Sequence, residues 1–177
     1  MPAVALAALL SAELSIHFGM GAGAIHTPGQ DFHFQGGPWP SKPDGLAISL
    51  ELQVEYGYVF GASTLVFASM NNSSEPVAAS VRAGLFLLPT TVAPYVAVGV
   101  GWLSELLQDG DSPPNLLAAD GAALLAEVGV TGPRHWTDGR ANVYAQIQKP
   151  LFDAPPDPYH TPPVTKPVYL AGIRLFF

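Results

Sequence analysis

Hydrophobic and more polar residues alternate along much of this chain, with the two-residue period of a β-strand. The alternation is clearest over residues 46–56. There the apolar set is Leu46, Ile48, Leu50, Leu52, Val54 and Tyr56, and the intervening set is Ala47, Ser49, Glu51, Gln53 and Glu55. Because successive side chains of a strand point to opposite faces, this segment predicts a strand with one apolar face and one more polar face.

The last ten residues, 168–177, follow the same rule. Their apolar set is Tyr169, Ala171, Ile173, Leu175 and Phe177. Arg174 stands in the other set. The length fits a strand that crosses a bilayer, which needs about 9–11 residues when it is tilted.

Taken over the whole chain, the pattern predicts eight strands. They lie near residues 13–25, 46–56, 62–70, 79–87, 94–103, 122–130, 140–148 and 168–177. Long Pro-containing stretches occupy 26–45, 104–120 and 150–166, a polar stretch occupies 71–76, and shorter turns lie elsewhere. An even strand number with alternating long and short connections is typical of bacterial single-chain barrels. The faces of the third strand stay open, because Leu65, Val66 and Phe67 are consecutive apolar residues.

Composition favours a membrane barrel over a soluble β-sandwich. The 177 residues are enough for one domain, and 49% of them are hydrophobic. No apolar run approaches the roughly 18 residues of a transmembrane helix. Only 12% of the residues are charged, against about 25% in ordinary soluble domains. We therefore predict an all-β fold, an eight-stranded antiparallel up-and-down transmembrane β-barrel.

Six charged residues within the predicted strands all fall on the face opposite the apolar one. They are Glu51, Glu55, Arg82, Glu127, Arg140 and Arg174. A Lys or Arg that faced lipid at mid-bilayer would cost roughly 2–4 kcal/mol. The lumen of an eight-stranded barrel is barely wide enough for its own side chains. We expect these six residues, with Gln53, Asn142, Gln146 and Gln148, to plug the lumen as a hydrogen-bonded ion-pair network.

Aromatic residues stand at the ends of the apolar faces, where girdles meet the membrane interfaces. They are Tyr56, Trp102, Tyr169 and Phe177. The final strand, with its terminal Phe177, resembles the C-terminal strand of Gram-negative outer-membrane β-barrels. In that family the barrel-assembly machinery reads this segment, so the resemblance implies an assembly signal. Its residues here would be Tyr169, Ile173, Leu175 and Phe177.

The whole chain from Glu13 resembles small eight-stranded outer-membrane barrels. Examples are the transmembrane domain of outer membrane protein A and the OmpX-like and OmpW-like proteins of the porin family. The resemblance implies a cell outer-membrane location with both termini periplasmic. It also implies contact with outer-membrane lipid and lipopolysaccharide. The resemblance is specific for the architecture but not for any subfamily, because the chain carries no subfamily motif.

Residues 1–12 are apolar and end in small residues, which is typical of the core of a secretory signal peptide. No positively charged segment precedes them, so we interpret them as a truncated signal peptide remnant. The alternative is an N-terminal helix or tail. The barrel domain is then predicted to cover residues 13–177.

The sequence offers no clear catalytic or metal site. Ser15 and His17 share one face of a strand, but same-face neighbours are about 7 Å apart, which predicts no hydrogen bond between them. Glu51 and Glu55 are likewise too far apart for an acid–base pair. The remaining histidines are His26, His33, His135 and His160, without metal-ligand spacing. We therefore expect no enzyme, cofactor or metal, and the net charge of −7 gives no argument for nucleic acid.

Two functions remain open from the sequence. The first is a structural barrel with a charged, plugged lumen that presents its extracellular segments for adhesion or ligand contact. The alternative is a narrow porin-like conduit or a binder of small or apolar solutes. Lipid A modification by an enzyme of this architecture ranks third. Aromatic residues of the long connections are candidates either for partner binding or for contact with lipopolysaccharide: Phe32, Phe34, Trp39, Tyr159 and His160.

Overall fold

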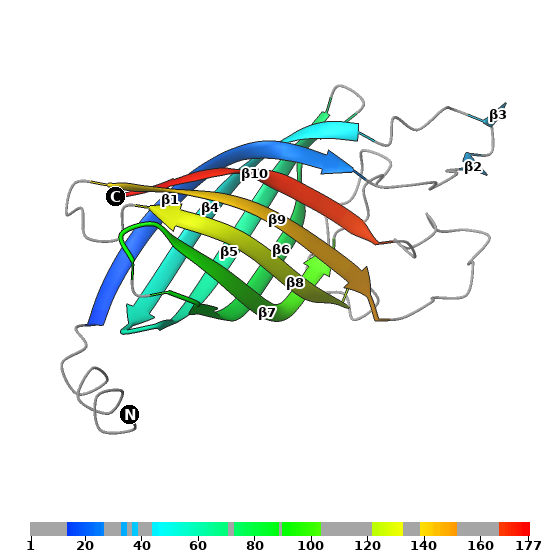
Figure 1. Cartoon of the computed structure of the whole chain (residues 1–177). Helices are drawn as coiled ribbons and strands as arrows, with labels where there is room; N and C mark the ends of the chain where they lie inside the picture. Colours follow the sequence, from blue (N-terminus) through cyan, green and yellow to red (C-terminus); the bar gives the residue numbers. More distant parts are fainter. Residues whose placement is uncertain are drawn as a thin grey trace.

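Eight long strands close into a barrel in the computed structural model of the chain (Figure 1). The structure describes residues 14–26, 33–34, 37–38, 44–70, 73–88, 90–103, 122–132, 139–151 and 167–177. The barrel strands are β1 (Leu14–His26), β4 (Asp44–Tyr56), β5 (Val59–Met70), β6 (Ser73–Phe86), β7 (Ala93–Leu103), β8 (Ala122–Gly132), β9 (Arg140–Pro150) and β10 (Val168–Phe176). A separate two-stranded sheet joins β2 (His33–Phe34) to β3 (Gly37–Pro38).

Each barrel strand pairs antiparallel with its neighbours in the chain, and β1 closes the ring by pairing with β10. The predicted eight-stranded, antiparallel, up-and-down barrel is confirmed. Closure continues past the last strand residue, because the Phe177 N–H donates to the Phe18 carbonyl oxygen at 2.8 Å. The closed ring pairs the backbone groups that an open sheet would leave at its two edges.

The two faces of the strands differ as the alternation predicts. The outward face carries exposed apolar side chains on the barrel strands, among them Phe18, Ile48, Val98, Val128 and Ile173. The inward face holds the buried residues, both apolar and charged. The third barrel strand, β5, whose two faces the sequence did not assign, follows the same rule. Ala62, Thr64 and Val66 are buried, whereas Gly61 and Ser63 are exposed.

The segment 71–76, expected as a polar connection, is mostly strand. Pairing of β5 with β6 runs to Met70 and Ser73, so only residues 71–72 separate the two strands. The register shifts between Val66 and Phe67, which face Ala78 and Pro76. Proline lacks a backbone N–H and is found in sheets at such irregularities. The prediction relied on the polar composition of this segment, but backbone pairing between the two strands continues beyond their alternating apolar residues.

The ends of other strands also lie beyond the predicted boundaries. β1 runs to His26, β4 begins at Asp44, and β9 continues to Pro150. The predicted connection 26–45 also contains the two short strands β2 and β3.

The barrel strands run alternately in opposite directions between the two ends of the barrel (Figure 1). The strand ends that the chain joins through residues 27–43, 71–72, 104–121 and 151–167 lie at one end, which we call the long-connection end, although 71–72 is a connection of two residues. Residues 57–58, 87–92 and 133–139 join strands at the other, the short-connection end. β1 starts at the short-connection end, and β10 finishes there.

Glycine makes room for an aromatic side chain on the inward face. Tyr95 of β7 stands directly opposite Gly129 of β8. A Cβ atom added to Gly129 would lie 2.5 Å from Cζ of the Tyr95 ring, so the ring lies across the glycine. Tyr95 also packs edge-on against Phe60, with ring centroids 5.5 Å apart. The small residue on β8 thus allows β7 to fill the narrow lumen with an aromatic ring.

Replacement of Gly129 by valine should therefore destabilise the barrel. The new side chain displaces the Tyr95 ring, and overpacking of this kind costs about 1–3 kcal/mol. The matched control is Ala126→Val, which adds volume to the exposed face of the same strand. Urea unfolding followed by tryptophan fluorescence measures both variants. Equal midpoints for Gly129→Val and the unchanged chain would contradict this packing.

Candidate functional site

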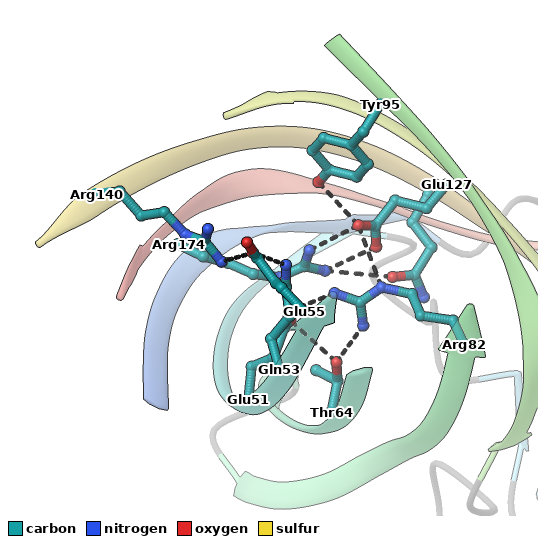
Figure 2. A network of polar contacts seen from close by, with 10 residues as sticks. Glu51, Gln53, Glu55, Thr64, Arg82, Tyr95, Glu127, Arg140 and Arg174 are labelled. Carbon is teal, nitrogen blue, oxygen red and sulfur yellow. Dashed lines mark hydrogen bonds and ion pairs between the residues drawn. The ribbon is translucent and has the colours of Figure 1, made fainter. Parts of the chain in front are cut away.

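The six predicted charged residues lie inside the barrel and are buried. Glu51 and Glu55 come from β4, Arg82 from β6, Glu127 from β8, Arg140 from β9 and Arg174 from β10. The structure brings four of them into one cluster and the other two into a neighbouring ion pair (Figure 2). None of these six side chains lies on the outer face.

Glu51, Arg82, Glu127 and Arg174 form the cluster, which we call the ionic quartet. Arg82 Nη2 lies 2.5 Å from Glu51 Oε1, and Arg82 Nε lies 3.4 Å from Glu127 Oε1. Arg174 donates two hydrogen bonds to Glu127, from Nη1 to Oε1 at 2.8 Å and from Nη2 to Oε2 at 2.9 Å. Its Nε completes the ring at 3.0 Å from Glu51 Oε2. Each carboxylate therefore touches two guanidinium groups, and each guanidinium touches two carboxylates.

The quartet is built from every second strand of the barrel. β4, β6, β8 and β10 supply one member each, and three of the strands between them, β5, β7 and β9, supply neutral partners. The inward side chains of alternate strands can meet in this way because an eight-stranded barrel is narrow. The charges alternate around the ring and sum to zero. An arrangement of this kind satisfies buried charges that would otherwise be strongly destabilising.

Neutral side chains complete the quartet. The Thr64 hydroxyl donates to Glu51 Oε2 at 3.0 Å and also contacts Arg82 Nη1. The Tyr95 hydroxyl donates to Glu127 Oε1 at 2.9 Å. The guanidinium of Arg174 lies 3.4 Å from the centroid of the Tyr144 ring, a cation–π contact. These residues are tied to the quartet but were not among its predicted members.

Glu55 and Arg140 form the second ion pair, toward the short-connection end. Gln53 Nε2 donates to Glu55 Oε1 at 2.7 Å. The Arg140 guanidinium also lies 4.9 Å from the centroid of the Phe176 ring. Unlike the members of the quartet, Arg140 meets a single carboxylate in the described part of the chain.

The four predicted amide partners divide into two groups. Gln53 and Gln146 join the charged residues, and Gln146 Oε1 accepts a long 3.5 Å hydrogen bond from Arg174 Nη2. Asn142 and Gln148 are buried, but Asn142 Oδ1 and both amide atoms of Gln148 have no hydrogen-bond partner among the described residues. The shared position of these four side chains on the inward face did not predict which of them form hydrogen bonds.

The prediction about Ser15 and His17 was wrong. His17 Nε2 lies 3.0 Å from Ser15 Oγ, within hydrogen-bond distance. The spacing of about 7 Å refers to the backbone positions, and the imidazole is long enough to reach along the strand. No described carboxylate hydrogen-bonds to His17, so the pair lacks the orienting acid of a catalytic triad.

The aromatic residues predicted as a girdle lie in two pairs. Tyr56 and Phe177 stand at the short-connection end, and Trp102 and Tyr169 stand at the long-connection end. Phe177 is 69% exposed and Tyr169 is 43% exposed, both on the outer face. The other residues of the proposed assembly signal, Ile173 and Leu175, are exposed on the same face.

One charged residue of the barrel strands was missed. Lys149 belongs to β9 and is exposed on the outer face, two residues beyond Ile147. The predicted strand ended at Gln148. Had the two-residue period been continued past that point, it would have placed Lys149 outside. It is the exception to the inward placement of charge among strand residues with described side chains.

The remaining predictions cannot be placed. Residues 1–12, Phe32, Trp39, Tyr159 and His160 lie outside the described residues, and so does the side chain of Phe34. No cluster of potential metal ligands occurs in the described ranges. None of the described segments is a helix long and apolar enough to span a membrane. Neither protein-family models nor curated proteins gave a match to the chain.

The quartet predicts a strong effect of removing one charge. Arg174→Met leaves Glu127 and Glu51 short of a partner, and breaking a buried ion pair costs about 3–5 kcal/mol. Arg140→Met should cost less, about 1–3 kcal/mol, because it leaves only Glu55 without its ion-pair partner. Denaturant unfolding of both variants gives the comparison.

A double variant separates charge from packing. Adding Glu127→Gln to Arg174→Met removes one of the two carboxylates that Arg174→Met leaves short of a partner. The double variant should therefore be less destabilised than the sum of the two single variants. Strict additivity would show that the two side chains do not act as one network.

Proposed function

We propose that this chain is an outer-membrane β-barrel of a Gram-negative bacterium, with a structural and surface-presenting role. Support comes from the combination of an apolar outer face and an ionic interior on the same strands. In water the exposed apolar residues of eight strands would form an unusually large hydrophobic surface. In a bilayer the same face meets hydrocarbon, and the closed ring leaves no open sheet edge in the lipid.

The ionic quartet is the single observation that carries the structural role. Its four members cross the lumen from alternate strands, and each charge lies beside two opposite charges, although Nε of Arg82 and Nε of Arg174 make no hydrogen bond among the described residues. A solute that passed through would have to separate buried ion pairs. We therefore propose a closed barrel that stabilises the membrane and presents its long connections for adhesion or ligand contact.

The proposed orientation places the short-connection end and both termini in the periplasm. Bacterial barrels have short periplasmic turns and longer extracellular loops. The long-connection end then faces the cell exterior, among lipopolysaccharide. The exposed outer-face residues Tyr169, Ile173, Leu175 and Phe177 fit a role as the signal for the barrel-assembly machinery, as the resemblance to that family implies.

A narrow conduit is the second candidate. The unpartnered amide atoms of Gln148 and Asn142 favour it, because buried polar groups of this kind interact with water or solutes. A catalytic role has less support. The Ser15–His17 pair has no described carboxylate bonded to the imidazole, and we propose that the protein is not an enzyme.

Conductance separates the two candidates. The folded protein in planar bilayers should show no stable, large open channel, because the quartet blocks the lumen. Electrophoresis of the recovered protein with and without boiling checks that it was folded. Reproducible large conductance steps from folded protein would overturn the closed-barrel proposal and favour the conduit.

A further inference from the structure

Lys149 breaks the rule that governs the other charges of the barrel strands. Arg82, Arg140 and Arg174 face the lumen, whereas Lys149 is exposed on the outer face at the long-connection end of β9. A cation on the lipid-facing side is tolerated only near the interface, where its cost falls from its mid-bilayer value to nearly zero. Its position marks where the apolar band ends and headgroups begin.

The neighbours of Lys149 form a polar and aromatic patch across three adjacent strands. Tyr169 of β10 stands opposite Ile147, so Lys149 is its diagonal neighbour on the same face, at a spacing of about 7–8 Å. On the other side Tyr169 pairs with His26 of β1, and their ring centroids are 6.2 Å apart. Among the described residues no carboxylate forms an ion pair with Lys149.

An acidic residue of β4 lies on the far side of this patch from Lys149. Asp44 of β4 stands opposite His26 and is separated from Lys149 by β1 and β10. The ammonium of Lys149 has three donors and no acceptor, so its natural partner is an anion. At the membrane interface, the anion available to a side chain on the outer face is the phosphate of a lipid headgroup.

We propose that Lys149, flanked by Tyr169, binds a phosphate of lipid A on the outside of the barrel. The inference rests on the proposed outer-membrane location, which places the long-connection end in the leaflet that contains lipopolysaccharide. Lys149 supplies the charge, and the Tyr169 ring lies at the level where aromatic residues meet headgroups. The contact fixes one glycolipid at the seam where β1 closes on β10 and β9.

Lipid A with and without its phosphates provides the test. The full chain, folded in a non-ionic detergent, is titrated with diphosphoryl lipid A and with the dephosphorylated form, and occupancy is read by native mass spectrometry. The unchanged chain should prefer the phosphorylated form by a factor on the order of five, the contribution of one lysine near an anionic surface. Lys149→Met should abolish most of this preference, and Lys149→Arg should keep it.

Ile147→Met is the matched control, because it alters the same face of the same strand without removing charge. It should retain the preference. The preference of the unchanged chain should also shrink in 1 M salt, where screening extends over only about 3 Å. An unchanged preference in Lys149→Met, or no preference in the unchanged chain, would overturn the inference.

The outcomes also separate this inference from the membrane proposal. Electrophoresis with and without boiling shows whether each variant is folded, and Lys149→Gln serves if the methionine variant is not. Insertion of the unchanged chain into phosphatidylcholine vesicles tests the location independently of lipid A. Insertion without phosphate preference defeats the lysine site alone, whereas failure to insert defeats the proposed function as well.

Discussion

The ring of alternating charges formed by Glu51, Arg82, Glu127 and Arg174 is the interaction on which the rest of the barrel depends. Buried charges are tolerated only with partners, and here each partner comes from a different strand. The quartet therefore links β4, β6, β8 and β10 across the lumen, in addition to the backbone pairing around the wall. One cluster thus both fills the interior and ties together strands that are not neighbours in the sheet.

The quartet also explains the sizes of its neighbours. A narrow lumen that holds two guanidinium groups needs small residues nearby, and Gly129 allows Tyr95 to lie flat enough to reach Glu127. The Tyr144 ring covers the face of the Arg174 guanidinium, whose edge already meets Glu127 and Glu51. In the closed barrel that we propose, interactions with the surroundings are left to the outer face and to the connections at the ends.

Alternation along the chain was enough to predict the barrel and the inward placement of the six charges of the lumen. It could not predict which carboxylate meets which guanidinium, because partners such as Glu51 and Arg82 depend on register and diagonal reach across intervening strands. Thr64 was missed because the neighbouring run of consecutive apolar residues prevented an assignment of the two faces of its strand. Ser15 and His17 were judged by backbone spacing, although side-chain reach decided their contact. Lys149 was missed because the strand end was placed two residues too early.

The central claim is that hydrocarbon surrounds the apolar face while the ionic groups stay inside, and site-directed spin labelling along β10 tests it most directly. The chain has no cysteine, so single cysteines at residues 170, 171, 173 and 175 can be labelled with a nitroxide in vesicle-embedded protein. The account predicts that labels at 171, 173 and 175 collide readily with oxygen dissolved in lipid and poorly with a water-soluble nickel complex. A label at the buried position 170 should be poorly accessible to both. Strong nickel accessibility at 171, 173 and 175 would show that water bathes this face and would contradict the account.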